Sequence, residues 1–162
     1  MPQKIGNPKP PCGVKRLLFR LPIWCYRLGC GWLLGKRFLL LKHVGRRSGL
    51  PRQTVLEVVN YDADTDTYFI ASGFGKQSDG YRNPLKTPAV SIQVGRRCMD
   101  VMAHPLTPED SGEAMVTYAR RYPKAARLIC RKVGYQVDGS EDDYRIIGRE
   151  AIPFVELRQI PM

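Results

Sequence analysis

A short basic segment between two apolar stretches has the composition of an anion-binding turn. It spans residues 45–52 and reads GRRSGLPR. Its two glycines allow close backbone approach and positive φ angles, and its serine hydroxyl and backbone N–H groups can line a concavity for an anion. Arg47 and Arg52 can each donate paired hydrogen bonds to a phosphate or a carboxylate. We therefore predict an anion site here, with an ordinary solvated hairpin loop as the alternative.

A second segment joins small residues to a cation at the end of an expected strand. It reads ASGFGK over residues 71–76 and is followed by YRN at residues 81–83. Both motifs lie in or next to a predicted loop at residues 73–88, and long loops in compact domains are usually functional or disordered. We predict that this loop has a functional role; a plain flexible connection is the alternative.

The sequence pattern predicts mainly strands around these segments. Apolar and β-branched runs predict strands at residues 37–44, 54–61, 67–72, 89–94, 98–104 and 152–157. Thr107 and Pro108 suit the start of a helix that ends near residue 121, and further helices are expected at 123–133 and 141–148. About six strands with few helices predict an α+β fold that is mainly β, an antiparallel barrel with flanking helices. We expect a flexible N-terminus at residues 1–12 and a single domain at 13–162.

Residues 13–34 are expected to form an amphipathic helical segment. Pro22 predicts a kink or two short helices, because proline removes a helical hydrogen bond. One face is apolar at helical spacing, with Leu17, Leu21, Trp24 and Leu28. This face either packs on the barrel or lies on an anionic membrane, with Trp24 and Trp32 as interfacial anchors. The stretch carries too many charges to span a bilayer.

The net charge of +11 predicts a polyanionic partner. Glu57 is the first acidic residue, and twelve lysines and arginines precede it. Nucleic acid, an anionic membrane surface and an anionic small molecule would each account for this charge. Nucleic acid is the weakest of the three, because the aromatic residues are not interleaved with the basic ones as a stacking platform requires.

The cysteines and histidines indicate a reducing compartment and no structural metal. The five cysteines are odd in number and form no C-x-x-C motif, which argues against a secreted disulfide framework. His43 and His104 are the only histidines, too few for a metal site with closely spaced ligands. We expect a cytoplasmic protein, and the membrane alternative would place it on the inner face of the cell membrane.

The order of four motifs resembles the deazaflavin-dependent nitroreductase and quinone reductase family. These motifs are H-x-G-R-R-S-G-x-P-R, A-S-G-x-G-K, Y-R-N and T-P-A-V-S-I-Q-V-G-R-R. The resemblance runs from about Leu21 to the last predicted strand. It implies a split β-barrel that binds coenzyme F420, whose reduced form passes a hydride to a quinone or nitroaromatic acceptor. FMN is the alternative cofactor, and a homodimer is expected because split barrels of this kind often pair.

The resemblance also implies roles for individual residues. It assigns the phosphate and glutamate tail of the coenzyme to Arg46, Arg47, Ser48, Gly49 and Arg52. It places near the deazaflavin ring Val55, Ala71, Ser72 and Gly73. Asn83 is expected to reach the coenzyme from the following segment, and Lys76 to supply a charge that some relatives place at the position of Gly73. Ser72 is also the candidate catalytic residue, as a donor to charge on the reduced acceptor, and Tyr81 and Tyr122 are expected to line the substrate.

The chain departs from its relatives at positions that bear on the acceptor. Many relatives have tryptophan where this chain has Gly80, and relatives that activate nitroimidazoles have tyrosines where this chain has Ala125 and Leu128. The glycine predicts an open wall of the pocket, and Ala125 and Leu128 argue against nitroimidazole activity while quinone reduction stays open. Two other functions stay open: a binding protein for F420, FMN or haem without turnover, and a basic nucleic-acid-binding protein.

Overall fold

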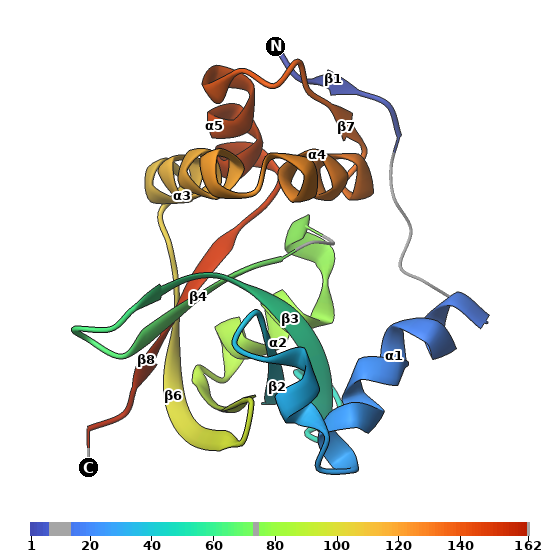
Figure 1. The fold of residues 1–162 in the computed structure, drawn as a ribbon, viewed down its shortest axis with the longest axis vertical. Coiled ribbons are helices and arrows are strands. Elements are labelled where there is room, and N and C mark those ends of the chain that lie inside the picture. Colours follow the sequence, from blue (N-terminus) through green and yellow to red (C-terminus); the bar gives the residue numbers. More distant parts are fainter. Residues whose placement is uncertain (7–13, 73–74, 162) are drawn as a thin grey trace.

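Six antiparallel strands form a closed barrel in the computed structural model, which describes residues 1–6, 14–72 and 75–161 (Figure 1). The strands run round the barrel in the order β2-β3-β4-β8-β6-β5, and β5 pairs with β2 to close it. Their bounds are β2 Phe38–Val44, β3 Pro51–Asp62, β4 Thr67–Ala71, β5 Ala89–Val94, β6 Arg97–Pro105 and β8 Phe154–Gln159. The predicted six-stranded antiparallel barrel is confirmed.

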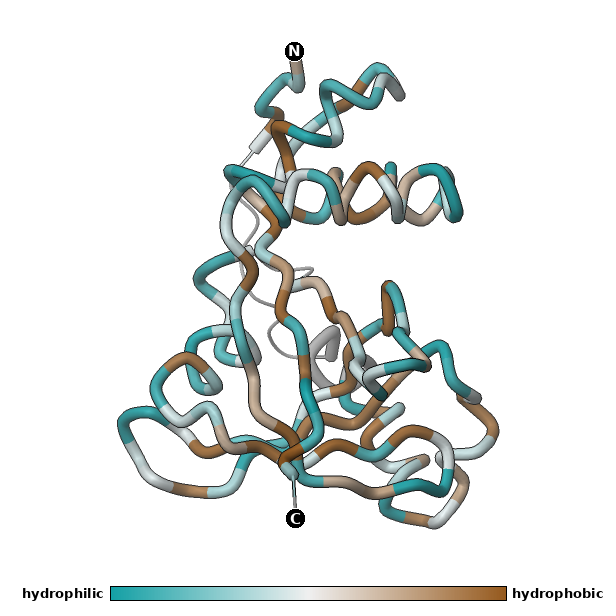
Figure 2. The backbone as a smooth tube through the Cα atoms, turned by 90° about the vertical axis from the view of Figure 1, so that its left-hand side faces the viewer, coloured by the Kyte–Doolittle hydropathy of each residue, from teal (hydrophilic) through white to brown (hydrophobic). Residues whose placement is uncertain are grey.

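One row of side chains from each strand fills the interior of the barrel. Along β2, Leu39 and Leu41 point into a buried cluster with side chains of the other five strands, whereas Lys42 between Leu41 and His43 is exposed. Figure 2 shows the same alternation of hydrophobic and hydrophilic residues along several strands. Because successive side chains of a strand point to opposite faces, every second side chain lies inside the barrel.

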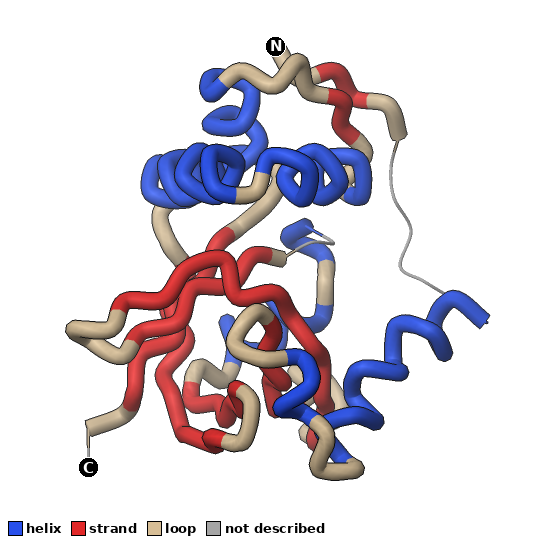
Figure 3. Tube along the Cα trace, viewed as in Figure 1, coloured by secondary structure: helices blue, strands red, loops and turns tan. Residues whose placement is uncertain are grey.

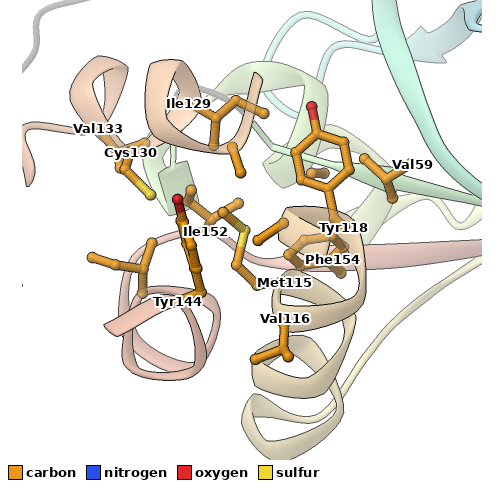
Figure 4. Close-up of a cluster of buried hydrophobic side chains, with 14 residues drawn as sticks. Val59, Met115, Val116, Tyr118, Ile129, Cys130, Val133, Tyr144, Ile152 and Phe154 are labelled. Atoms are coloured by element: carbon orange, nitrogen blue, oxygen red, sulfur yellow. The ribbon is translucent and has the colours of Figure 1, made fainter. Parts of the chain in front are cut away.

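Three helices at one end of the barrel build a second core. They are α3 Pro108–Arg121, α4 Pro123–Lys132 and α5 Glu141–Glu150 (Figure 3). Thr107 caps α3 by accepting the N–H of Asp110 at 3.2 Å, and Ser140 caps α5 by accepting the N–H of Asp143 at 3.2 Å. Their apolar faces meet the barrel around Met115 and Phe154 (Figure 4).

The N-terminal helical segment does not divide into two helices at Pro22. Helix α1, Val14–Arg27, runs through Pro22 as one element, and a 3₁₀ helix, η1, follows at Gly31–Leu34. Between them lies Gly29 with φ +76°, a backbone angle that glycine adopts at little cost. The chain therefore breaks at a glycine after the helix and not at the proline inside it.

The face of α1 that packs on the barrel is not the face that the spacing suggested. Ile23 and Tyr26 are buried against Leu40 of β2, and the Tyr26 hydroxyl donates a 3.2 Å hydrogen bond to the carbonyl of Phe38. Trp24 and Leu28 instead remain 50% and 75% exposed. None of the helices in the described part of the chain has the length and hydropathy needed to cross a membrane.

Two further elements differ from the predicted layout. The predicted loop at 73–88 contains a 3₁₀ helix, η2 Gly75–Gln77, and an α-helix, α2 Asp79–Lys86. Glycine, asparagine and proline within α2 disfavour a helix on local propensity, so its contacts with the rest of the protein decide its conformation. Near the N-terminus, in the segment expected to be flexible, β1 (Gln3–Lys4) pairs with β7 (Tyr135–Gln136).

Candidate functional site

The basic segment at residues 45–52 forms the turn of the β2–β3 hairpin, and we call it the cationic turn. Val44 pairs with Pro51, the N–H of Gly45 donates to the carbonyl of Leu50 at 2.9 Å, and the N–H of Gly49 donates to the carbonyl of Gly45 at 2.9 Å. Gly49 has φ +69°, which explains a glycine at this position. These hydrogen bonds fix the shape of the turn, on which residues 47–50 are exposed and Arg46 is half-buried.

Gly45 is required by the close approach of Ser48. A Cβ at position 45 would lie 2.6 Å from Ser48 Oγ and 3.6 Å from Arg52 Nε. The same hydroxyl accepts the N–H of Leu50 at 3.2 Å, so a side chain at 45 would displace a hydrogen-bonding partner of the turn. Position 45 therefore has little room for a side chain between Ser48 and Arg52.

Arg46 is held in place by helix α2. Its guanidinium Nη1 donates to Asp79 at 2.6 Å and to Asn83 Oδ1 at 3.0 Å, and its backbone N–H donates to the same Asn83 oxygen at 3.1 Å. Lys86 Nζ donates to the Arg46 carbonyl at 2.6 Å. The hydrogen bond from Arg46 lowers the pKa of Asp79. Arg46 therefore anchors the turn to α2.

Arg47 and Arg52 are the available cations of the turn. Both are exposed, and neither has an ion-pair partner within the described ranges 1–6, 14–72 and 75–161. Arg52 lies opposite His43 in the β2–β3 ladder, at the base of the turn. Two guanidinium groups on a rigid turn can make paired hydrogen bonds to phosphate or carboxylate oxygens.

The structure commits the Ser72 hydroxyl to protein partners. Ser72 Oγ donates to the carbonyl of Gly75 at 2.6 Å and lies 2.7 Å from Ser78 Oγ, which precedes α2. A serine hydroxyl has one proton, so Ser78 is the donor in the second contact. The side chain is buried. This arrangement makes Ser72 a support for the segment that leads to α2 and gives no support to a donor role toward an acceptor.

The other predicted site residues fall into several environments. Asn83 is 2% exposed and bonds to Arg46 and His43. Val55 packs under α1, and Tyr81 packs against the barrel core. Ala71 is buried with the helical core, while Lys76 is exposed on η2. Gly73 lies outside the described residues. Among the described residues of this group, Asn83 is the one hydrogen-bonded to the cationic turn.

Tyr122 lies between α3 and α4 in a cluster of charged and aromatic groups. The guanidinium carbons of Arg37 and Arg121 lie 4.9 and 5.6 Å from its ring centroid, distances typical of cation–π contacts. Next to it, the Tyr118 hydroxyl donates to Glu57 Oε2 at 2.8 Å, and Glu57 accepts from Arg37 at 3.3 Å. Tyr122 is half-buried, so part of it is available to a ligand.

Replacing Tyr118 with phenylalanine is expected to destabilise the protein by about 1.5–3 kcal/mol, the range for a hydrogen bond to a charged group. Tyr118 is 2% exposed, and its hydroxyl is directed toward Glu57. Burial and the Glu57 hydrogen bond raise the pKa of Tyr118. Urea unfolding measures the change, with Tyr61→Phe as the control for an exposed tyrosine. A Tyr118→Phe protein as stable as wild type would contradict this role for the Glu57 hydrogen bond.

Two surface hollows lie away from these residues. One of about 410 Å³ is on β4 and β8, and one of about 290 Å³ is beside α4 and β7. Neither is lined by a predicted site residue. Within the described part of the chain, no group of three or more His, Cys, Asp or Glu side chains could hold a metal ion. The site is thus defined by the charge and rigidity of the cationic turn.

Sequence reasoning missed three residues that shape the turn. Asp79 and Lys86 bind Arg46, and His43 accepts a hydrogen bond from Asn83. His43 stands in the quoted H-x-G-R-R motif, which was its only signal. Asp79 and Lys86 lie in α2, which was predicted as loop, so their approach to Arg46 depends on a tertiary contact.

The closed antiparallel barrel with added helices and an arginine-bearing hairpin turn defines a split β-barrel protein. A family model described as F420H(2)-dependent quinone reductase matches residues 20–134. The chain therefore belongs to the F420H(2)-dependent quinone reductase family, a family of F420-dependent oxidoreductases. Comparison with curated proteins gives no match.

Solved structures agree on the fold. An F420-H2 dependent reductase, FDR-A, has 22% identity and a TM-score of 0.53, with 76% of this chain and 96% of that chain covered. A protein described as a domain-swapped dimer has 20% identity and a TM-score of 0.55, with 90% and 100% covered. A pyridoxamine 5'-phosphate oxidase-related, FMN-binding protein from Nostoc punctiforme has 16% identity and a TM-score of 0.55, with 85% and 80% covered. At these identities the likeness establishes the fold alone.

Proposed function

We propose that this protein is an F420H2-dependent reductase whose acceptor is a quinone. The observation that carries the proposal is the cationic turn, in which hydrogen bonds to Asp79 and to buried Asn83 fix Arg46 and leave Arg47 and Arg52 open to an anion. The family to which the chain belongs is described as F420H(2)-dependent, and we assign F420 as the coenzyme on this basis. The turn supplies a physical reason for the family's anionic coenzyme to bind at this place.

The residues present fit the charged part of F420. The coenzyme carries a phosphodiester and a glutamate tail, which are the groups that arginine forks bind best. Gly49 leaves the turn open, because a Cβ at this position would have no heavy atom within 4 Å. We assign the phosphodiester and tail to Arg47 and Arg52, with Ser48 and the turn's backbone beside them.

The protein's work in this reaction is binding and orientation. The reduced coenzyme, when bound, supplies the hydride. Arg47 and Arg52 hold the charged tail, and Asp79 and Asn83 keep the turn rigid through Arg46, so orientation costs little entropy at the moment of reaction. Ser72 and Ser78 hold the segment between β4 and α2 in place.

A quinone is favoured over a nitroimidazole by the residues beside Tyr122 and by the family description. Ala125 and Leu128 of α4 stand where nitroimidazole-activating relatives carry tyrosines. Position 80 lies next to Thr54, because a Cβ there would be 3.3 Å from Thr54 Cγ2. A tryptophan at this position would add a wall that this chain lacks.

Anaerobic oxidation of F420H2 in the presence of menadione tests the proposed reaction. We expect quinone-dependent loss of F420H2 that requires the protein, and slower or no turnover with a nitroimidazole. Tight F420 binding without acceptor-dependent oxidation would instead support a binding protein. Tight binding of FMN or haem with none of F420 would contradict the coenzyme assignment.

We also propose that the exposed face of α1 and η1 rests on an anionic lipid surface. Its large apolar side chains are Leu21, Trp24, Leu28, Trp32 and Leu33. Arg27 lies over the Trp24 ring at 5.2 Å and Arg96 lies over the Trp32 ring at 5.8 Å, and no acidic residue precedes Glu57. Aromatic anchors next to unneutralised cations match the interface of a negatively charged membrane.

A pair of matched leucine variants tests the membrane contact. Leu28→Ser removes an exposed leucine from the proposed face, and Leu128→Ser removes a 57% exposed leucine from α4. We expect Leu28→Ser to weaken binding to phosphatidylserine-containing vesicles about tenfold, from the apolar area a leucine buries, and Leu128→Ser to leave it unchanged. Equal effects, or equal binding to neutral vesicles, would contradict the proposal. If sedimentation shows instead that only Leu28→Ser disrupts self-association, the face belongs to a homodimer.

A further inference from the structure

A buried hydrogen-bond chain links the cationic turn to a histidine at the end of β2. His43 is 5% exposed and continues the inward row of Leu39 and Leu41 at one end of the barrel. Asn83 of α2 covers it, with its amide 3.0 Å from His43 Nδ1. Asn83 in turn holds Arg46. The chain therefore runs from His43 through Asn83 to the turn that is assigned to the coenzyme tail.

The donors around Asn83 determine the orientation of its amide. The backbone N–H and the guanidinium Nη1 of Arg46 are both donors, and both point to the same Asn83 atom at 3.1 and 3.0 Å. That atom must be the acceptor oxygen, so the amide N–H group faces His43. His43 Nδ1 must then accept a hydrogen bond. The ring is consequently neutral, with its proton on Nε2.

We propose that neutral His43 is a positioning residue for the cationic turn, and that its protonation weakens binding of the coenzyme tail. This inference rests on the proposed function. A proton on Nδ1 would face the Asn83 N–H group as a second donor. Rotating the amide would relieve that contact only by turning its N–H group toward the two donors of Arg46. Either outcome breaks a hydrogen bond that fixes the turn.

The charges around His43 set the pH range of this effect. Burial lowers the pKa of His43, Asp79 on α2 raises it, and Arg52 on β3 lowers it further. The pKa of His43 in the folded protein is therefore lower than in the unfolded chain, where a histidine has a pKa of about 6.5. Neutral His43 therefore makes its whole contribution to the free energy of unfolding above that pH, and this contribution is lost as the pH falls below it. Binding measurements must be made where circular dichroism shows the protein folded.

The coenzyme test compares wild type with two variants across pH 5 to pH 8. His43→Asn places an amide oxygen where Nδ1 stands and cannot titrate, and His104→Asn is the matched control at the chain's other, exposed histidine. From pH 8 to pH 5, the F420 affinity of wild type and of His104→Asn should fall about tenfold further than that of His43→Asn. This is the effect of one net hydrogen bond. Equal pH profiles for all three would overturn the positioning role. Absence of F420 binding to wild type at pH 8 would instead contradict the proposed function.

A measurement on the protein alone tests the same chain without the coenzyme. Nitrogen NMR of His43 should show an unprotonated Nδ1 at pH 8, and the Arg46 amide resonance should move when His43 is titrated. Adding F420 should lower the apparent pKa of His43, because the coenzyme selects the neutral form. Simple attraction between an anion and a histidinium would raise it, and that result, or a protonated Nδ1 at pH 8, would overturn the inference.

Discussion

Replacing both Arg47 and Arg52 with alanine is expected to weaken F420 binding by about 2–6 kcal/mol, because each hydrogen bond to a charged group contributes about 1.5–3 kcal/mol and solvent exposure of both side chains reduces the lower bound. This corresponds to roughly 30-fold to ten-thousandfold in the dissociation constant. Both side chains are exposed on a turn that Arg46, Asp79 and Asn83 hold in place. The fold should be unaffected, because neither side chain has an ion-pair partner within the described residues. Fluorescence titration with oxidised F420 measures the change.

The control for this experiment is Arg149→Ala. Arg149 lies on α5 with a half-exposed side chain, 3.7 Å from Glu109, so the substitution removes one positive charge away from the turn. We expect F420 affinity within about twofold of wild type for this variant, since exposed ion pairs contribute little. A double variant at Arg47 and Arg52 that binds F420 as Arg149→Ala does would contradict the assigned roles.

Gly148→Ala is expected to destabilise the protein by about 3 kcal/mol or more, at the upper end of the range for overpacking. An added Cβ would lie 2.4 Å from the Ser111 carbonyl oxygen and 2.8 Å from Gly112 Cα. These are backbone atoms of α3, so α3 and α5 would have to separate. In an unconstrained helix the same change would stabilise by about 1 kcal/mol, so the sign of the effect is itself informative. Urea unfolding measures it.

Gly6→Ala is the matched control for the packing argument. A Cβ at Gly6 has no heavy atom within 4 Å, so this substitution should change the free energy of unfolding by less than about 0.5 kcal/mol, the range for surface changes. If Gly148→Ala proved as stable as Gly6→Ala, α3 and α5 could not cross as closely as the structure has them.

Elements with strong local signals were predictable from the sequence. The barrel strands alternate or run apolar, and Thr107 with Pro108 begins α3 as predicted. Helix α2 was missed because Gly80, Asn83 and Pro84 lower its helix propensity. What forms it is the contact of Asn83 with Arg46 and His43, which no local pattern contains.

The cationic turn was predictable and its support was not. Arginines, glycines and a serine between two strands are a local signal, and the structure places Arg47, Ser48 and Arg52 together on one hairpin turn. The contacts of Ser72 and of α1 are made with residues that the local sequence pattern does not identify. Ser72 meets Ser78 and Gly75, and α1 turns Ile23 rather than Trp24 toward the barrel. Tertiary contacts decide both.

Titration of the protein with F420 and with the deazaflavin chromophore that lacks the phosphodiester and glutamates tests the central claim most directly. The claim is that the cationic turn binds the charged tail. Intact F420 should bind about 30-fold or more tightly than the chromophore, as two charge-assisted contacts imply, and the Arg47 and Arg52 double variant should bind both equally. Equal affinities in wild type, or a preference for intact F420 that survives the double substitution, would contradict the account.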